Sequence, residues 1–233
     1  MTDLTLALAP PPARAPAASQ TDAVFDLPRS MPLVLDLDGT LIAGDLLYKS
    51  FFSILRRNPL IVFSCAAWLL GGRAVLKRQL ALRSRIDWDR VRFHQDVVGL
   101  AIREKALGRA VALATAADAV LAEQLASLLP CIDQVFASDG KQNLKGPAKA
   151  ELLGRLYPDG FIYAGDSKSD LAVWARARGI VLVRARPSVH AAARALRLPT
   201  LELSGWARWW TPVSRLRNPN AIIRLQRVAR SEP

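Results

Sequence analysis

The chain has 233 residues, 51% hydrophobic and 22% charged, so it can bury a core and is neither disordered throughout nor fibrous. Thirty-two Lys and Arg against 20 Asp and Glu give a net charge of +12, which favours phosphorylated ligands, nucleic acid or an anionic membrane without choosing among them. The two cysteines, Cys65 and Cys131, are too few for a disulfide framework and lack zinc-site spacing, which indicates a cytoplasmic, reducing setting.

The first segment, residues 1–30, is rich in Ala and Pro. Its apolar run, Leu4 to Ala9, is interrupted at once by three prolines, so neither a helix nor a core strand is expected there. The first basic residue, Arg14, follows this run instead of preceding it, which is unlike a secretory signal. We expect a disordered tail.

Several short apolar runs further along the chain each lead into a turn and have the length of buried strands. They are Leu33–Leu37, Val111–Ala114, Val135–Ala137, Phe161–Ala164 and Ile180–Val183. Helical stretches lie between most of them, at Asp118–Leu129, Pro147–Leu156 and Asp170–Arg178. This alternation predicts an α/β fold, a Rossmann-like three-layer core with a mainly parallel sheet, formed by residues 31–44 and 110–203.

Residues 45–109 are helical in composition and too long for a simple crossover, so they predict an inserted all-helical cap. No residue between Asn58 and Gly72 is charged, yet this stretch is too short to span a bilayer. Arginines border it on both sides, and the next acid is Asp87. Two interpretations stay open: a buried cap helix, or a hairpin that meets an anionic membrane surface or covers the active site.

The last segment, residues 204–233, carries three tryptophans followed by five arginines and a single acid, Glu232. Tryptophan at headgroup level and arginine near phosphate suit a membrane interface, while ordinary packing or a solvated tail is the alternative. Nucleic acid is the least favoured partner because no recognised binding motif accompanies these residues.

Polar residues follow the predicted strands, where ligands bind in open parallel sheets. They are Asp36, Asp38, Gly39 and Thr40 after the first run, Thr115 after the second, Lys145 before a helix, and Gly165, Asp166 and Asp170 after the fourth. Each signal has an ordinary alternative: an Asp-x-Asp-Gly segment can be a plain turn, and Lys141 and Lys149 compete with Lys145. The two histidines, His94 and His190, lie outside these motifs.

The order of these residues resembles the four motifs of the haloacid dehalogenase superfamily over roughly residues 31–185, and Asn-Leu-Lys-Gly at Lys145 is similar to its phosphoserine-phosphatase-like branch. The resemblance implies that Asp36 attacks phosphorus to form an aspartyl-phosphate and that Asp38 exchanges protons with the leaving group and water. Thr115 and Lys145 would hold the transferring phosphoryl group.

The same resemblance implies a Mg²⁺ cofactor. Its ligands would be the Asp36 carboxylate, the main-chain carbonyl of Asp38 and Asp166, with Asp170 holding a water or orienting Lys145. A cation is expected because the Asp36 carboxylate must approach an anionic phosphate.

A narrower resemblance points to the dehalogenase-type domain found ahead of UbiA-type prenyltransferases. It is carried by Leu35–Leu41, Asp45–Leu47, the Arg-Arg-Asn-Pro turn, Asn143–Gly146 and Tyr163–Ser167. The chain lacks the multi-helix transferase part, so the partner implied is a separate membrane prenyltransferase or none. We expect a Mg²⁺-dependent phosphatase on the inner face of the membrane, acting on a phosphomonoester, preferably a lipid-linked one. The alternatives are a non-catalytic adaptor domain and a phosphotransferase.

Overall fold

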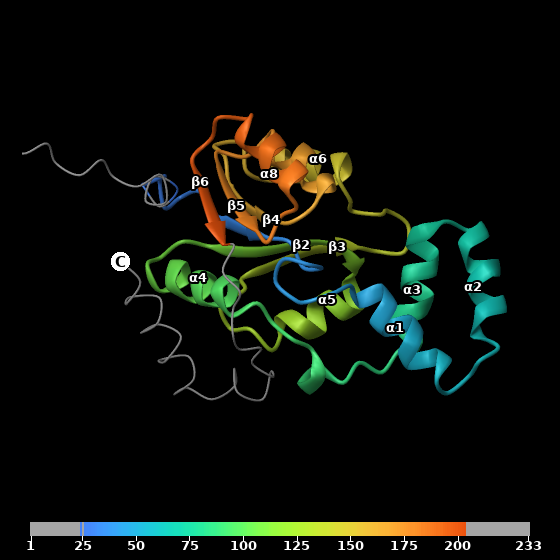
Figure 1. The fold of residues 1–233 in the computed structure, drawn as a ribbon. Helices are drawn as coiled ribbons and strands as arrows, with labels where there is room; N and C mark the ends of the chain where they lie inside the picture. The colour runs from blue at the N-terminus through green and yellow to red at the C-terminus, as the bar shows by residue number, and fades with distance from the viewer. Residues whose placement is uncertain (1–23, 25, 204–233) are drawn as a thin grey trace, which may run out of the picture.

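The structure, a computed structural model, describes Val24 and residues 26–203. Six parallel strands form one sheet in the order β3-β2-β1-β4-β5-β6 (Figure 1). Their bounds are β1 Leu33–Leu35, β2 Val111–Asp118, β3 Gln134–Ser138, β4 Ile162–Gly165, β5 Gly179–Val183 and β6 Thr200–Leu203. The predicted α/β fold with a parallel sheet is confirmed. Strand β6 was not predicted, because Thr-Leu-Glu-Leu is short and half polar, as suits an edge strand.

Helices cover both faces of the sheet, which is why the central strands are apolar along their whole length. Leu33 and Leu35 of β1 pack in one cluster with α4 (Gln95–Ala106) and α5 (Ala119–Ala126). Val34, which points the other way, packs in a second cluster with α6 (Pro147–Leu156), α7 (Leu171–Trp174) and α8 (Pro187–Arg194). These layers hold the carboxyl ends of β1, β2 and β4 together.

The cap consists of α1 (Leu46–Leu55), α2 (Ile61–Leu70) and α3 (Arg73–Arg83), followed by a short 3-10 turn at Trp88–Arg90. It has a small cluster of its own around Ile54, Ile61 and Leu80. In Figure 1, α1 and α3 lie next to the core and α2 is outermost. The cap is shorter than the predicted residues 45–109, because α4 belongs to the sheet layer; composition cannot tell a sheet-covering helix from a cap helix.

The chain entering β1 also differs from the expected disordered tail of residues 1–30. Val24 is completely buried, and the fully buried Arg109 guanidinium donates hydrogen bonds to the carbonyl oxygens of Leu27, Pro28 and Met31. The Arg109 charge is paired with Glu104 at 2.8 Å. Residues 1–23 and the basic segment 204–233 lie outside the described residues. In the part that the structure describes, no helix is long and apolar enough to cross a membrane.

Candidate active site

A cavity of about 190 Å³ lies between the cap and the carboxyl ends of the central strands. The core lines it with Asp36, Asp38, Asp166, Lys145 and Lys149, among others. The cap contributes Leu46, Leu47 and Ser50 from α1 and Lys77 from α3. The core and the cap therefore both line the site.

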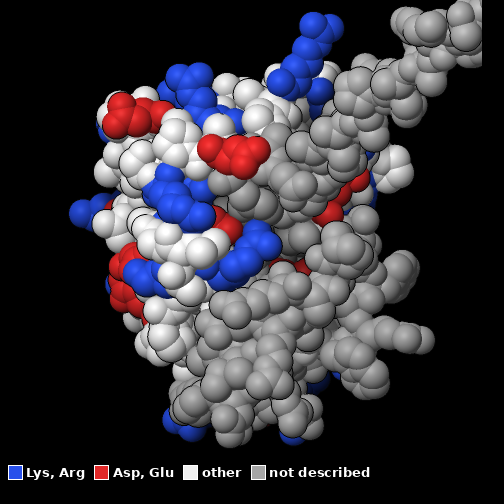
Figure 2. Space-filling view, turned by 90° about the vertical axis from the view of Figure 1, so that its left-hand side faces the viewer, with Lys and Arg blue, Asp and Glu red and all other residues white. Residues whose placement is uncertain are grey.

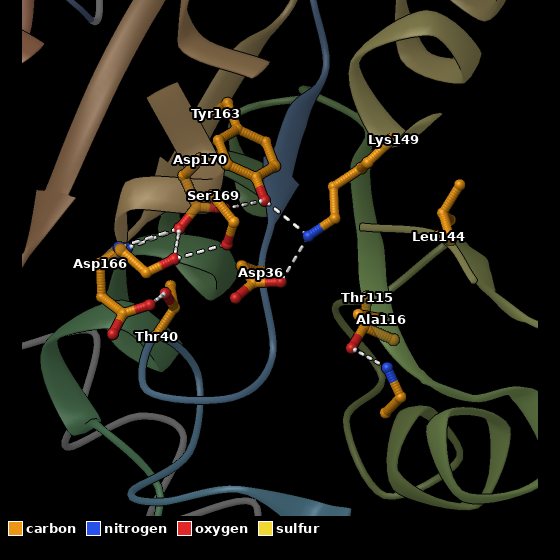
Figure 3. A network of polar contacts seen from close by, with 12 residues as sticks. Asp36, Thr40, Thr115, Ala116, Leu144, Lys149, Tyr163, Asp166, Ser169 and Asp170 are labelled. Carbon is orange, nitrogen blue, oxygen red and sulfur yellow. Dashed lines mark hydrogen bonds and ion pairs between the residues drawn. The ribbon is translucent and has the colours of Figure 1, made fainter. Parts of the chain in front are cut away.

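Asp36 follows β1 and is held there by a hydrogen bond from its backbone N–H to the Ala164 carbonyl oxygen of β4. Its side chain is buried, and its Oδ1 accepts a hydrogen bond of 2.6 Å from the Lys149 ammonium (Figure 3). Burial raises the Asp36 pKa to about 6, with a further increase from Asp170 and an opposing effect of Lys149. The Asp36 carboxyl group is therefore mostly ionised at neutral pH, and the Lys149 ammonium favours this charged form.

Asp38 lies two residues further on, at the entrance to the cap. Its Oδ1 accepts a hydrogen bond of 2.8 Å from the backbone N–H of Leu46, the first residue of α1. Burial and then the nearby Asp45 carboxylate raise the Asp38 pKa to about 7. A carboxyl group with this pKa can both give and take a proton near neutral pH, which general acid–base chemistry requires.

Gly39 meets two demands that strongly favour glycine. Its φ of 82° lies in the left-handed region, and a Cβ added there would come within 2.4 Å of Asp166 Oδ2. The missing side chain therefore lets the chain leave β1 while Asp166 approaches the site.

The two acids that follow β4 are fixed by different contacts. Asp170 is buried, and its Oδ2 accepts hydrogen bonds from the Ser167 backbone N–H (2.9 Å) and hydroxyl (2.7 Å), while its Oδ1 accepts one from the Tyr163 hydroxyl (2.9 Å). Asp166 Oδ1 accepts a 3.3 Å hydrogen bond from the Thr40 hydroxyl. Burial, followed by repulsion from Asp36 and Asp170, raises the Asp166 pKa to about 7.

Three of the predicted metal ligands come together. Carboxylate oxygens of Asp36, Asp166 and Asp170 lie within 4.8 Å of one another. An all-oxygen donor set crowded by like charges fits a hard divalent cation such as Mg²⁺, which would relieve the repulsion that raises the pKa of Asp36 and Asp166. The Asp38 carboxylate is not in this group, and the role of its main-chain carbonyl as a ligand stays a prediction.

Lys149, one of the two lysines that compete with Lys145 in the sequence, contacts Asp36. Lys149 is buried on α6, and its Nζ also donates a 2.8 Å hydrogen bond to the Tyr163 hydroxyl. Lys145 lies just before α6, lines the same cavity and is exposed. The two lysines are four residues apart, about one helical turn, so one sequence pattern fits both. The apolar neighbours Ala150 and Leu153, which mark the buried face of α6, were the signal that could have favoured Lys149.

Thr115 is completely buried within β2, where the pairing with β3 becomes irregular after Ala114, and its hydroxyl oxygen accepts a 2.9 Å hydrogen bond from the backbone N–H of Ala117. Its neighbours Ala116 and Ala117 line the cavity. No sequence motif indicated Lys77, a cap residue whose Nζ donates hydrogen bonds to the Ala116 carbonyl oxygen (2.7 Å) and to Asn143 Oδ1 (2.9 Å). Burial lowers the pKa of Lys77, although Asp38 favours its charged form.

Comparison with known sequences gives one relative of undetermined activity. No protein-family model matches the chain. Over 155 residues it is 37% identical to uncharacterized protein y4nM of Sinorhizobium fredii, a match that covers 66% of this chain but only 30% of that protein. The chain therefore corresponds to less than a third of this relative.

Comparison with solved structures gives the fold. A substrate-bound phosphoserine phosphatase superimposes with a TM-score of 0.52 at 16% identity, covering 75% of this chain and 93% of that one. A probable phosphoserine phosphatase from Vibrio cholerae gives 0.52 at 15% identity over 89% and 69% of the two chains. A HAD family hydrolase from Salmonella enterica serovar Typhi gives 0.52 at 15% identity over 76% and 69%. The chain thus shares the fold of these phosphoserine phosphatases and of this HAD (haloacid dehalogenase) family hydrolase.

Proposed function

We propose that the chain is a phosphohydrolase that cleaves phosphomonoesters with Asp36 as the nucleophile. The observation that carries the proposal is the position of the Asp36 carboxylate, which lies between the Lys149 ammonium on one side and Asp166 and Asp170 on the other. A nucleophile, a cation and an acidic cluster suited to a metal, all at the carboxyl end of β1, are the components of phosphoryl transfer. The shared fold with phosphoserine phosphatases agrees with this chemistry.

The reaction has two steps. The Asp36 oxygen that is not held by Lys149 attacks phosphorus while the bond from phosphorus to the leaving oxygen breaks, and Asp38 gives that oxygen its proton. The aspartyl-phosphate is then hydrolysed: Asp38 takes a proton from water, the water oxygen bonds to phosphorus, and the bond from phosphorus to Asp36 breaks. Inorganic phosphate leaves and both carboxyl groups return to their starting states.

Asp36, Asp166 and Asp170, with the Asp38 carbonyl, would hold the Mg²⁺ ion, which supplies positive charge against the anionic phosphate. Lys149 neutralises the Asp36 carboxylate between turnovers, and Tyr163 connects Lys149 to Asp170. Gly39 leaves the space that Asp166 needs. Thr115 supports the backbone of the last residues of β2, which border the cavity, and Lys145 at the rim adds positive charge for the incoming phosphate.

Within this proposal, the substrate class that we favour is a lipid-linked phosphate at a membrane surface, reached from the cytoplasmic side. The support is the composition of the two cap helices that border the cavity: α1 is mainly apolar, α3 is basic, and neither contains an acid. A membrane prenyltransferase is the partner that the sequence resemblance implies. The alternative, a non-catalytic adaptor domain, would not need the buried pairing of Lys149 with Asp36, and a phosphotransferase would share the first step but deliver the phosphoryl group to another acceptor.

The test is a phosphatase screen with Mg²⁺ that includes soluble phosphomonoesters and lipid phosphates, with Asp36→Asn as the control. We expect release of inorganic phosphate by the natural chain and a loss of at least about 10³-fold in Asp36→Asn, because an amide is a poor nucleophile. Equal activity of the two proteins would overturn the mechanism. Turnover of soluble phosphomonoesters alone would overturn the lipid part, and a phosphorylated product other than phosphate would indicate a phosphotransferase.

A further inference from the structure

The outermost cap helix, α2, exposes apolar side chains instead of polar ones. Only Ile61 of α2 is buried, whereas Phe63 is 75% exposed and Leu70 is 92% exposed. We call the outward side of this helix and the residue before it the apolar cap face; its large members are Leu60, Val62, Phe63, Leu69 and Leu70. A surface helix of a globular protein normally turns charged residues outward. The outward side of α2 has none.

Exposed apolar residues concentrate in the cap. Ten large hydrophobic side chains are exposed in the described part of the chain, and eight of them lie between residues 46 and 86. The other two, Leu107 and Leu156, are single residues on the core. Scattered exposed leucines need no explanation, but a contiguous apolar face marks an interaction site.

The charge of the cap is equally one-sided. Residues 46–86 contain no Asp or Glu and eight Lys or Arg, a net charge of +8. Arg56 and Arg57 come before α2 and Arg73 comes after it; all three are exposed and none has an ion-pair partner among the described residues. Figure 2, which shows the side of the molecule away from the cap, has basic and acidic residues interspersed on its described part. The acid-free charge is therefore a property of the cap and not of the whole surface.

We propose that the apolar cap face, with Arg56, Arg57 and Arg73 at its ends, docks on an anionic lipid bilayer. A ten-residue helix is about 15 Å long, too short to cross a membrane but able to lie flat in the interface with its apolar side among the acyl chains. Arginines at both ends of such a helix reach the lipid phosphates. The apolar side chains and the arginines would then both bind the same bilayer, the first its acyl chains and the second its phosphates.

Other occupants fit less well. A second copy of the chain would bring a cap of net charge +8 against another of the same charge, which opposes a two-fold interface there. Nucleic acid would pair with the arginines but would leave Phe63, Leu69 and Leu70 in water. An anionic bilayer alone among these three takes both the charge and the apolar side chains.

Docking by this face would bring the cap to the bilayer, because α1 and α3, the two cap helices that line the cavity, pack directly against α2. The cavity would then lie behind α1 and α3, one helix layer away from the docked face. The relevance to catalysis rests on the proposed function, but the docking itself does not require turnover.

The experiment is co-sedimentation of the full chain with phosphatidylcholine vesicles, with and without phosphatidylglycerol. We expect binding that requires phosphatidylglycerol and falls at least about tenfold in the double variant Phe63→Asp, Leu70→Asp. The matched control is Leu107→Asp, Leu156→Asp, which adds the same two charges at the exposed leucines of the core and should bind within about twofold of the natural chain. Replacing Arg56, Arg57 and Arg73 with Gln should weaken the binding to phosphatidylglycerol vesicles.

Three outcomes would overturn the proposal. They are equal binding of the natural chain and the Phe63→Asp, Leu70→Asp variant, equal losses in that variant and the Leu107→Asp, Leu156→Asp control, and a dimer in sedimentation velocity that dissociates in the cap variant. Thermal unfolding of each variant checks the fold. Hydrolysis of a soluble phosphomonoester, measured without vesicles, separates this proposal from the proposed function, because either one can fail while the other stands.

Discussion

The catalytic core and the cap place polar and apolar groups in opposite ways. In the core, the charged residues Asp36, Lys149 and Asp170 are inside, and each makes hydrogen bonds to its neighbours. In the cap, Phe63 and Leu70 are outside, and the helices keep only a small cluster of their own. Burying charge is costly unless it is paired, and exposing large apolar groups is costly unless something covers them. The core therefore pairs the charges that it buries, whereas the cap leaves large apolar side chains uncovered, as the proposed division between phosphoryl transfer and membrane binding requires.

The largest effect that tests the core is the replacement of its buried lysine. Lys149→Met should lower kcat by about 10²–10³-fold, because it removes the cation that contacts Asp36 Oδ1 at 2.6 Å. Lys145→Met, at the exposed rim, should change kcat less than tenfold and act mainly on KM. Steady-state kinetics of the two variants on a soluble phosphomonoester shows which lysine matters more for kcat, and circular dichroism checks that both variants fold. If Lys145→Met loses more kcat than Lys149→Met, then Lys145, the residue that the sequence motif indicates, is the main cation of the active site.

This pair of lysines also shows what the sequence could and could not predict. The strands that contain Val34, Leu113 and Tyr163 were predictable because buried parallel strands are apolar throughout, and the acids after them follow from where such sheets bind ligands. The choice between Lys145 and Lys149 depends on the rotation of α6 about its axis, which a one-turn spacing leaves open. Lys77 reaches the cavity only through the tertiary packing of the cap, so no local pattern pointed to it.

The extent of the cap was hard to predict for a related reason. Helix α4 has the same helical composition as the cap helices before it, but its residues Val97, Val98 and Ala101 pack against the sheet. A helical pattern shows that one side is buried without showing which layer buries it. The outward side of α2 could not be assigned either, because the helix is apolar on nearly every side and its sequence fits a buried helix as well as a surface one.

The second prediction concerns the crowding of acids in the core. The pKa values of Asp38 and Asp166 are about 7, above the ordinary value of 3.8. Between pH 4 and pH 7, roughly, the folded protein therefore binds more protons than the unfolded chain. In EDTA these groups therefore lower the free energy of unfolding progressively as the pH rises from about 4 to about 7. At pH 7.5, Asp166→Asn should therefore have a free energy of unfolding about a few kcal/mol higher than that of the natural chain, and it should unfold at a higher temperature. At pH 4.5 the difference in free energy should be much smaller.

With Mg²⁺ present, the natural chain should become more stable than Asp166→Asn. At pH 7.5 the ion should stabilise the natural chain by binding its folded form, and it should stabilise Asp166→Asn much less. Thermal unfolding with EDTA and with Mg²⁺, at both pH values, gives the four comparisons needed. Asp89→Asn, an exposed acid in the turn after the cap, is the matched control and should follow the natural chain. If Asp166→Asn is no more stable than the natural chain in EDTA at pH 7.5, the acids are not crowded in solution as they are in this structure.

The smallest predicted effect is on the contact that joins the two regions. Lys77 lies on α3 of the cap, and two hydrogen bonds tie its ammonium to Ala116 and Asn143 of the core. Lys77→Met should raise KM about five- to tenfold and leave kcat within about threefold, because the ammonium orders the cavity wall without contacting Asp36 or Asp166. Arg85→Met, an exposed basic residue beyond α3, removes the same charge outside the cavity and should leave both constants unchanged. A fall in kcat as large as that of Lys149→Met would mean that Lys77 acts on the transferring group itself, and that the division between a catalytic core and a substrate-selecting cap is drawn in the wrong place.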